Sequence, residues 1–185
     1  MTAAPFALNE PGLSYNEVMQ LRLATSEDVP GIMQIVRGVI PMLRAAGNLQ
    51  WDDRYPNPEV FEQDIELGQL WVASIDDRIA GIVATTTEQY PEYVQAGWDI
   101  TDTAIVVHRL AVGPEFQGKG IAAALLRHAE VVARSRSLGR VLADTNSHNQ
   151  VMQHLLPKLG YAFSGEITLD FRPGMRFLCY EKVLK

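Results

Sequence analysis

The feature that most constrains the fold is an almost wholly apolar run, "TAIVVHRLAV" (Thr103 to Val112), followed shortly by "FQGKGIAAALL" (Phe116 to Leu126). A strand that is apolar on both faces must be covered on both faces, as in the middle of a sheet between helices. Gly118 and Gly120 indicate a tight turn, and the apolar spacing after it predicts an amphipathic helix from about Ile121. The sequence therefore predicts an α/β protein whose central strand turns directly into a helix.

The rest of the chain also alternates between patterns typical of strands and helices. A capping pair, Thr25 and Asp28, predicts the start of a first helix, and Pro41 should kink or divide it. Two apolar runs, 70–75 and 78–87, are separated only by Asp76-Asp77 and predict a hairpin. With a short strand at 140–145, a helix at about 148–159 and a C-terminal hairpin, the order becomes β-α-α-β-β-β-α-β-α-β-β. This order predicts a mixed sheet flanked by helices.

The length of the chain and the lack of periodicity in its first residues indicate its domain organisation. Residues 1–17 contain prolines and a glycine without periodicity, so we expect a flexible N-terminal arm. The remaining residues, 18–185, suffice for one well-filled core, since 47% of the 185 residues are hydrophobic. We expect a single domain.

Composition also argues against several classes of function. The formal net charge of −6 makes a nucleic-acid partner a poor expectation. One cysteine allows no internal disulfide, and the four histidines show no metal-ligand spacing, so no metal is expected. No apolar run approaches the roughly 20 residues of a membrane span. Because the N-terminus also lacks the pattern of a signal peptide, we expect a cytoplasmic location without membrane association.

The glycine turn has two interpretations from its residues alone. Glycines can serve only to bend the chain between strand and helix. They can also let backbone N–H groups of the helix start approach an anion, which the helix dipole favours. The turn matches neither GxxxxGK[ST] nor GxGxxG, so the common nucleotide-binding motifs do not explain it.

Taken together, "HRLAV", "FQGKGIAAALL" and "DTNSHNQVMQHLLPKLGY" resemble the core of the GNAT superfamily of N-acetyltransferases. The run 117–122 fits the family's Q/R-x-x-G-x-G/A signature, and Asn149 with the "KLGY" ending fits a second one. The element order extends the resemblance over roughly residues 21–184. It implies a GNAT-like acyltransferase fold with splayed central strands, acetyl-CoA as acyl donor, and direct attack by a primary amine in a ternary complex.

The resemblance also implies which residues bind coenzyme A. Backbone groups of the central strand would pair with the pantetheine arm, and backbone N–H groups of the turn would hold the pyrophosphate. Lys119 would add positive charge near a phosphate, or it is simply a solvated lysine of the loop. Asn149 would contact pantetheine, or it only caps the helix that follows. The implied coenzyme-binding residues are Leu110, Ala111, Val112, Gln117, Gly118, Lys119, Gly120, Ile121, Ala122 and Asn149.

The sequence departs from the family at the catalytic positions. Many members carry a tyrosine where this chain has Leu156, and some carry a glutamate where it has Val106. His108, which shares the strand parity of Leu110, and Asp144 are the candidates for proton transfer. Each has the alternative of a structural role.

For the acceptor we expect a pocket of aromatic residues with nearby carboxylates, suited to an amine. Its candidates are Trp51, Tyr55, Tyr90 and Trp98, and the loop "QWDDRYP" (50–56) favours a small molecule. The expected function is acetyl transfer to a small amine. The alternatives are acetylation of a protein N-terminus or lysine, and a non-catalytic acyl-CoA sensor. A homodimer is common in the family.

Overall fold

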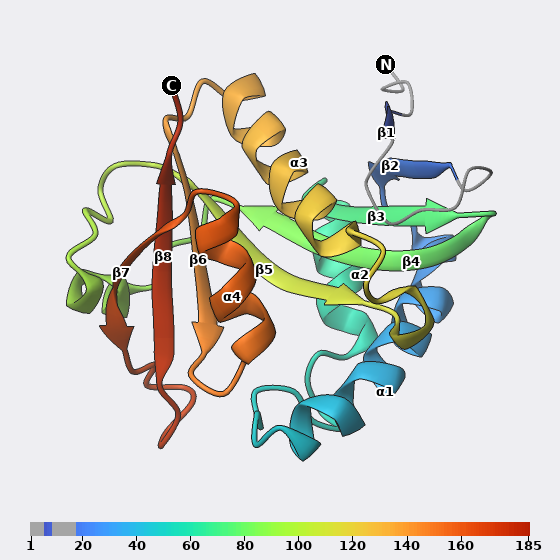
Figure 1. The fold of residues 1–185 in the computed structure, drawn as a ribbon, viewed down its shortest axis with the longest axis horizontal. Helices are drawn as coiled ribbons and strands as arrows, with labels where there is room; N and C mark the ends of the chain where they lie inside the picture. Colours follow the sequence, from blue (N-terminus) through green and yellow to red (C-terminus); the bar gives the residue numbers. More distant parts are fainter. Residues whose placement is uncertain (1–5, 9–17) are drawn as a thin grey trace. The chain divides into compact units, whose positions relative to one another are not determined.

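The computed structural model describes residues 6–8 and 18–185 (Figure 1). The chain divides into two compact units, each made of segments distant in sequence. The first unit comprises Met1–Met42, Trp51–Ala84 and Arg109–Arg127. The second comprises Leu43–Gln50, Thr85–His108 and His128–Lys185.

The first unit contains an antiparallel group of strands in the order β1-β2-β3-β4. These strands are β1 (Phe6–Leu8), β2 (Met19–Leu23), β3 (Leu70–Ile75) and β4 (Arg78–Thr86), whose last two residues belong to the second unit. The predicted hairpin of β3 and β4 is confirmed. Asp76 and Asp77 both have positive φ, 49° and 60°, as tight two-residue hairpin turns require.

Helix α1 (Val29–Ala45) follows the predicted capping box of Thr25 and Asp28, which the structure confirms. Asp28 also accepts two hydrogen bonds from the guanidinium of Arg22 on β2, at 2.7 and 2.8 Å. Pro41 lies inside α1 and does not divide it, contrary to one of the two expectations for this proline. Helix α2 (Pro58–Glu66) begins at Asn57, whose side chain accepts a hydrogen bond from Val60 N.

The core of the first unit fixes the end of strand β5 (Ile105–Val112) and the start of helix α3 (Ile121–Ser135) against β4. Gly113 N donates to Ala80 O at 2.9 Å. A Cβ on Gly81 would lie 2.8 Å from the side chain of Ile121 and 3.1 Å from Ala111 O. Close packing at a residue without a side chain therefore sets the position of the strand end and of the helix that follows the glycine turn.

The second unit has strands in the order β5-β6-β8-β7, with β6 (Arg140–Asn146), β8 (Phe177–Val183) and β7 (Ala162–Ile167) (Figure 1). The first half of β5 pairs in parallel with β6, through Ile105–Val107 and Val141–Ala143, and the other pairs are antiparallel. The unit also contains helix α4 (Gln150–Lys158) and the short 3-10 helix η2 (Pro91–Ala96). Its core surrounds Tyr93 and Phe177, both fully buried.

The predicted fold class is confirmed: mixed strands with flanking helices in the predicted order. The structure also contains elements that the sequence did not predict, among them a strand and a 3-10 helix. Residues 6–8 form a strand within the expected flexible arm, whose other residues lie outside the described part of the chain. The 3-10 helix η2 lies in an aromatic and acidic stretch without clear periodicity. None of the described helices is both long and apolar enough to span a membrane.

Candidate functional site

The glycine turn connects β5 to α3 through the short 3-10 helix η3 (Pro114–Phe116). Gly118 and Gly120 have φ of 78° and 79°, a conformation that residues with a side chain rarely adopt. Ala124 N donates to Gly120 O at 3.0 Å, so the N–H groups of residues 121–123 precede the first hydrogen bonds of the helix. The turn thus places several backbone donors at the positive end of the helix dipole.

The geometry of the turn fits an anionic group such as the pyrophosphate of coenzyme A. A Cβ on Gly118 would meet nothing within 4 Å, so the glycine faces open space rather than packed protein. Gln117 is exposed, with its Nε2 3.7 Å from Met42 Sδ, and Lys119 is half-buried. The same positive φ bends the chain and keeps side chains away from the donors, so binding of an anion at this turn stays a prediction.

Strand β5 carries an irregularity that the sequence did not reveal. Arg109 has φ of 52°, although it is neither glycine nor part of a turn between elements. A left-handed residue inside a strand interrupts the regular alternation of the residues on either side. His108 and Leu110 were expected to face the same side of the strand because they are two residues apart. With Arg109 in this conformation between them, that expectation no longer follows from their spacing.

The side chain of Arg109 is held by a buried ion pair, which sequence reasoning also missed. Its Nε lies 2.6 Å from Asp64 Oδ2 and its Nη2 lies 2.8 Å from Asp64 Oδ1. Tyr55 Oη lies 3.4 Å from Nη1. Burial acts to lower the pKa of Arg109, but the charges and hydrogen bonds of Asp64 and Tyr55 together outweigh burial and raise the pKa above its usual value. Asp64 is only 3% exposed, on a helix position that periodicity would give to an apolar side chain.

In the second unit, Asp144 on β6 accepts a hydrogen bond from the hydroxyl of Tyr93, at 2.6 Å. Burial raises the pKa of Asp144, while the hydrogen bond from Tyr93 acts in the opposite direction. Burial and the charge of Asp144 also raise the pKa of Tyr93 well above its usual value. Asp144 nevertheless keeps part of its surface accessible. A recessed carboxylate with a raised pKa and a hydroxyl partner is suited to accept a proton.

Aromatic rings gather beside this pair. The ring of Tyr90 lies 5.4 Å from Tyr93, 5.5 Å from His108 and 5.1 Å from Phe171, between ring centroids. Phe171, in the loop between β7 and β8, was not predicted as a site residue, and no local pattern distinguishes it. The structure thus brings Tyr90, His108 and the Tyr93–Asp144 pair into one cluster.

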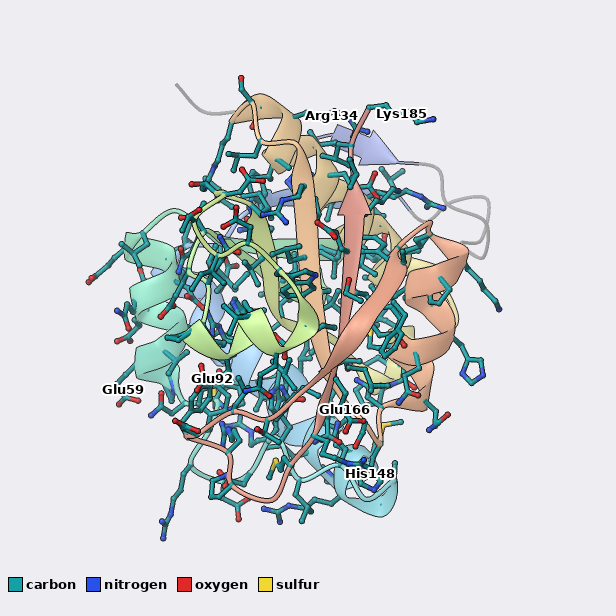
Figure 2. All side chains as sticks on the ribbon, turned by 90° about the vertical axis from the view of Figure 1, so that its left-hand side faces the viewer. Glu59, Glu92, Arg134, His148, Glu166 and Lys185 are labelled. Carbon is teal, nitrogen blue, oxygen red and sulfur yellow. The ribbon has the colours of Figure 1, made fainter. Side chains whose placement is uncertain are left out.

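The four predicted acceptor residues differ in how much of their surface a ligand could reach. Trp51 and Trp98 are 6% and 4% exposed, so their aromatic faces belong to the core and offer little surface to a ligand. Tyr55 and Tyr90 remain partly accessible. The nearby carboxylates are also engaged: Glu92, labelled in Figure 2, accepts a hydrogen bond from Asp170 N, and Asp102 pairs with Arg140.

The second motif lies on α4. Asn149 caps this helix, its side-chain oxygen accepting a hydrogen bond from Met152 N at 3.3 Å. This hydrogen bond engages the side-chain oxygen of Asn149. A contact between its amide nitrogen and pantetheine stays a prediction. Leu156 and Val106 are fully buried, so these two apolar side chains belong to the core. Among the described residues, no three histidine, cysteine or acidic side chains are grouped as a metal would require.

Comparison with known proteins relates these features to a family. The model of the acetyltransferase (GNAT) family matches residues 40–161, which include the glycine turn and α4. The uncharacterized N-acetyltransferase YesJ of Bacillus subtilis is 26% identical over 146 residues, 77% of this chain and 81% of that protein. N-acetylaspartate synthetase of Danio rerio is 29% identical over 106 residues, 57% of this chain, which span only 34% of that protein.

Solved structures share the fold. A GNAT acetyltransferase from Streptococcus agalactiae superposes with a TM-score of 0.77 at 29% identity, covering 90% of this chain and 96% of that chain. The acetyltransferase yncA of Salmonella typhimurium, solved with its cofactor acetyl-CoA, has a TM-score of 0.66 at 19% identity and covers 90% and 94%. The match of the family model over most of the chain, together with the strand, turn and helix it contains, shows that this protein belongs to the acetyltransferase (GNAT) family.

Proposed function

We propose that the protein transfers an acetyl group from acetyl-CoA to the primary amine of a small molecule, by direct attack in a ternary complex. The observation that carries this proposal is the glycine turn after β5, with its backbone donors at the start of α3, inside the region that the family model matches. Backbone groups of Leu110, Ala111 and Val112 would hold the pantetheine arm. Those of Gln117 to Ala122 would hold the pyrophosphate.

The reaction forms a bond between the amine nitrogen and the acetyl carbon and breaks the bond from that carbon to sulfur. An N–H of the strand end would polarise the carbonyl. The proton lost by the amine would go to Asp144, with His108 as the second candidate. Leu156 cannot donate a proton to the departing thiolate, but an ordinary thiol pKa near 8.5 lets the thiolate leave and take a proton from water.

The acceptor class is inferred from the ring cluster and the recessed carboxylate. Tyr90, Phe171 and Asp144 offer aromatic faces and negative charge to an amine before it loses its proton. N-acetylaspartate synthetase, one of the relatives, is named for a small amino-acid product, in keeping with a metabolite acceptor. The cytoplasmic location and a homodimer stay predictions.

A second candidate function is an acyl-CoA sensor without catalysis. Val106 and Leu156 support it, because both side chains are buried and apolar and neither can transfer a proton. Acetylation of a protein N-terminus or lysine is the remaining alternative, without a contact in the structure that favours it.

The test is to incubate the protein with acetyl-CoA and a panel of polyamines, amino acids, aminoglycosides and peptides, and to follow free thiol. Saturable thiol release with a small amine, with the acetylated product found by mass spectrometry, is the expected result. Release with peptides alone would favour a protein acceptor. Coenzyme binding without release above hydrolysis would favour the sensor, and absence of coenzyme binding would refute all three functions.

A further inference from the structure

The positive φ of Arg109 requires a physical cause. Four non-glycine residues in the described part of the chain have positive φ, and the other three, Asp76, Asp77 and Ser137, lie in turns. Arg109 alone among them lies within a strand, and an arginine has no short side chain that would favour this conformation locally. Contacts with the rest of the protein must therefore hold the backbone in this state.

The ion pair with Asp64 provides the strongest of these contacts. Both oxygens of the carboxylate accept from the guanidinium, in the bidentate geometry that fixes a side chain in direction as well as distance. Asp64 is itself held, since Gln69 Nε2 donates to its Oδ1 at 2.8 Å. With side chains 12% and 4% exposed, the pair is screened little by solvent.

The loop "QWDDRYP" contributes a second contact to the same guanidinium. Asp52 Oδ1 accepts hydrogen bonds from the backbone N–H groups of Arg54 and Tyr55, at 2.8 and 2.9 Å. Asp52 N donates to Tyr55 O at 2.8 Å, which closes the turn. The turn fixes Tyr55, whose hydroxyl lies 3.4 Å from Arg109 Nη1. The loop 50–56, which the sequence analysis assigned to the acceptor pocket, thus also contacts Arg109 on β5.

We propose that Arg109, held by Asp64 and Tyr55, is a positioning residue for acetyl transfer: it keeps β5 in a left-handed turn that directs the following backbone N–H groups toward the thioester carbonyl. In a regular strand successive N–H groups alternate between the two neighbouring strands. A single left-handed residue shifts this alternation and releases the next groups from the ladder. The inference rests on the proposed function, because it assigns the Leu110 end of β5 to the coenzyme.

The test compares two double variants that remove the same charges and differ only in a Cβ. Asp64→Asn with Arg109→Gly leaves a residue that adopts positive φ readily, whereas Asp64→Asn with Arg109→Ala leaves one that does not. Acetyl-CoA labelled with ¹³C at the acetyl carbonyl reports polarisation through its infrared stretch. Binding to the wild-type protein should shift this band to lower frequency.

The glycine variant should keep most of the infrared shift, and the alanine variant should lose most of it. With an amine identified by the panel, the alanine variant should also have kcat lowered about tenfold or more, with little change in KM for acetyl-CoA. Equal shifts in the two double variants would overturn the inference, because stability or charge alone would then explain the ion pair. A wild-type protein that fails to bind acetyl-CoA would overturn the proposed function and the inference with it.

A milder variant keeps the test decisive if the double variants fail to fold. Arg109→Lys keeps the charge and loses the bidentate geometry, so the infrared shift should decrease while coenzyme affinity stays within about threefold. The matched control is Arg22→Lys, which breaks the similar bidentate pair with Asp28 in the same unit. Arg22→Lys should leave the infrared shift unchanged. An unchanged shift in Arg109→Lys as well would count against the positioning role.

Discussion

At the scale of single residues, the Tyr93 hydroxyl limits how far burial raises the pKa of Asp144. Its hydrogen bond stabilises the carboxylate and so opposes the rise in the pKa of Asp144 that burial causes. Tyr93→Phe removes this donor, and the pKa of Asp144 should rise further. If Asp144 accepts the proton of the amine, it must be ionised, so the acidic limb of the pH profile of kcat/KM should move to higher pH.

A matched control is Tyr161→Phe, another almost fully buried tyrosine of the second unit, whose pKa burial likewise raises. This variant should leave the acidic limb where it is in the wild-type protein. If the limb stays in place in Tyr93→Phe as well, Asp144 is not the proton acceptor. His108 then becomes the residue to test by replacement with alanine.

The glycines of the turn give a second prediction at this scale. Gly120→Val should abolish coenzyme A binding, because a branched side chain would be strained at φ of 79° and would occupy space beside the backbone donors. Gly68→Val is the control, since Gly68 also has a positive φ, 63°, and faces open space at the end of α2. Isothermal titration calorimetry with coenzyme A should detect binding to this control. Wild-type affinity in Gly120→Val would contradict the assignment of the turn.

At the scale of elements, variants of Asn149 can distinguish capping of helix α4 from binding of coenzyme A. Asn149→Asp keeps the oxygen that accepts from Met152 N and removes the amide nitrogen, so α4 should keep its stability while coenzyme affinity falls. Asn149→Ala should lose about 1 kcal/mol of unfolding free energy as well. Urea denaturation and calorimetric titration measure the two effects.

The control for this pair lies at the start of α2. Asn57 accepts a hydrogen bond from Val60 N at 3.1 Å and belongs to a helix without a predicted coenzyme contact. Asn57→Ala should lower stability by a similar amount and leave coenzyme affinity unchanged. Equal affinity in Asn149→Asp and the wild-type protein would reduce Asn149 to a helix cap.

The elements themselves could largely be predicted from sequence because their signals are local. Apolar runs defined β5 and the β3–β4 hairpin, and Asp76-Asp77 and the glycines marked their turns by residue type. The Arg109–Asp64 pair could not be predicted, since it joins residues 45 positions apart and depends on a strand conformation that arginine does not favour. The burial of Trp51 and Trp98 could not be predicted either, because aromatic residues in a loop can line a pocket or pack into a core.

At the scale of the whole molecule, the boundaries between the two units mostly fall inside regular elements. Helix α1, strands β4 and β5, and helix α3 each contribute residues to both units. A helix or strand gains its hydrogen bonds cooperatively, so melting one part of such an element destabilises the other part. This continuity supports the prediction that residues 18–185 form a single domain, which unfolds as one.

Tryptophan fluorescence can test this cooperativity together with ligand binding. A variant that keeps only Trp71 reports on the first unit, and one that keeps only Trp98 reports on the second. In each variant, the urea midpoint followed by fluorescence should coincide with the midpoint followed by far-UV circular dichroism, because one transition unfolds both units. Coenzyme A at 100 times its Kd should raise the unfolding free energy by about 2.7 kcal/mol for both probes. Separate midpoints, or stabilisation seen by Trp71 alone, would instead show that the units unfold independently and that the coenzyme stabilises only the unit containing the glycine turn.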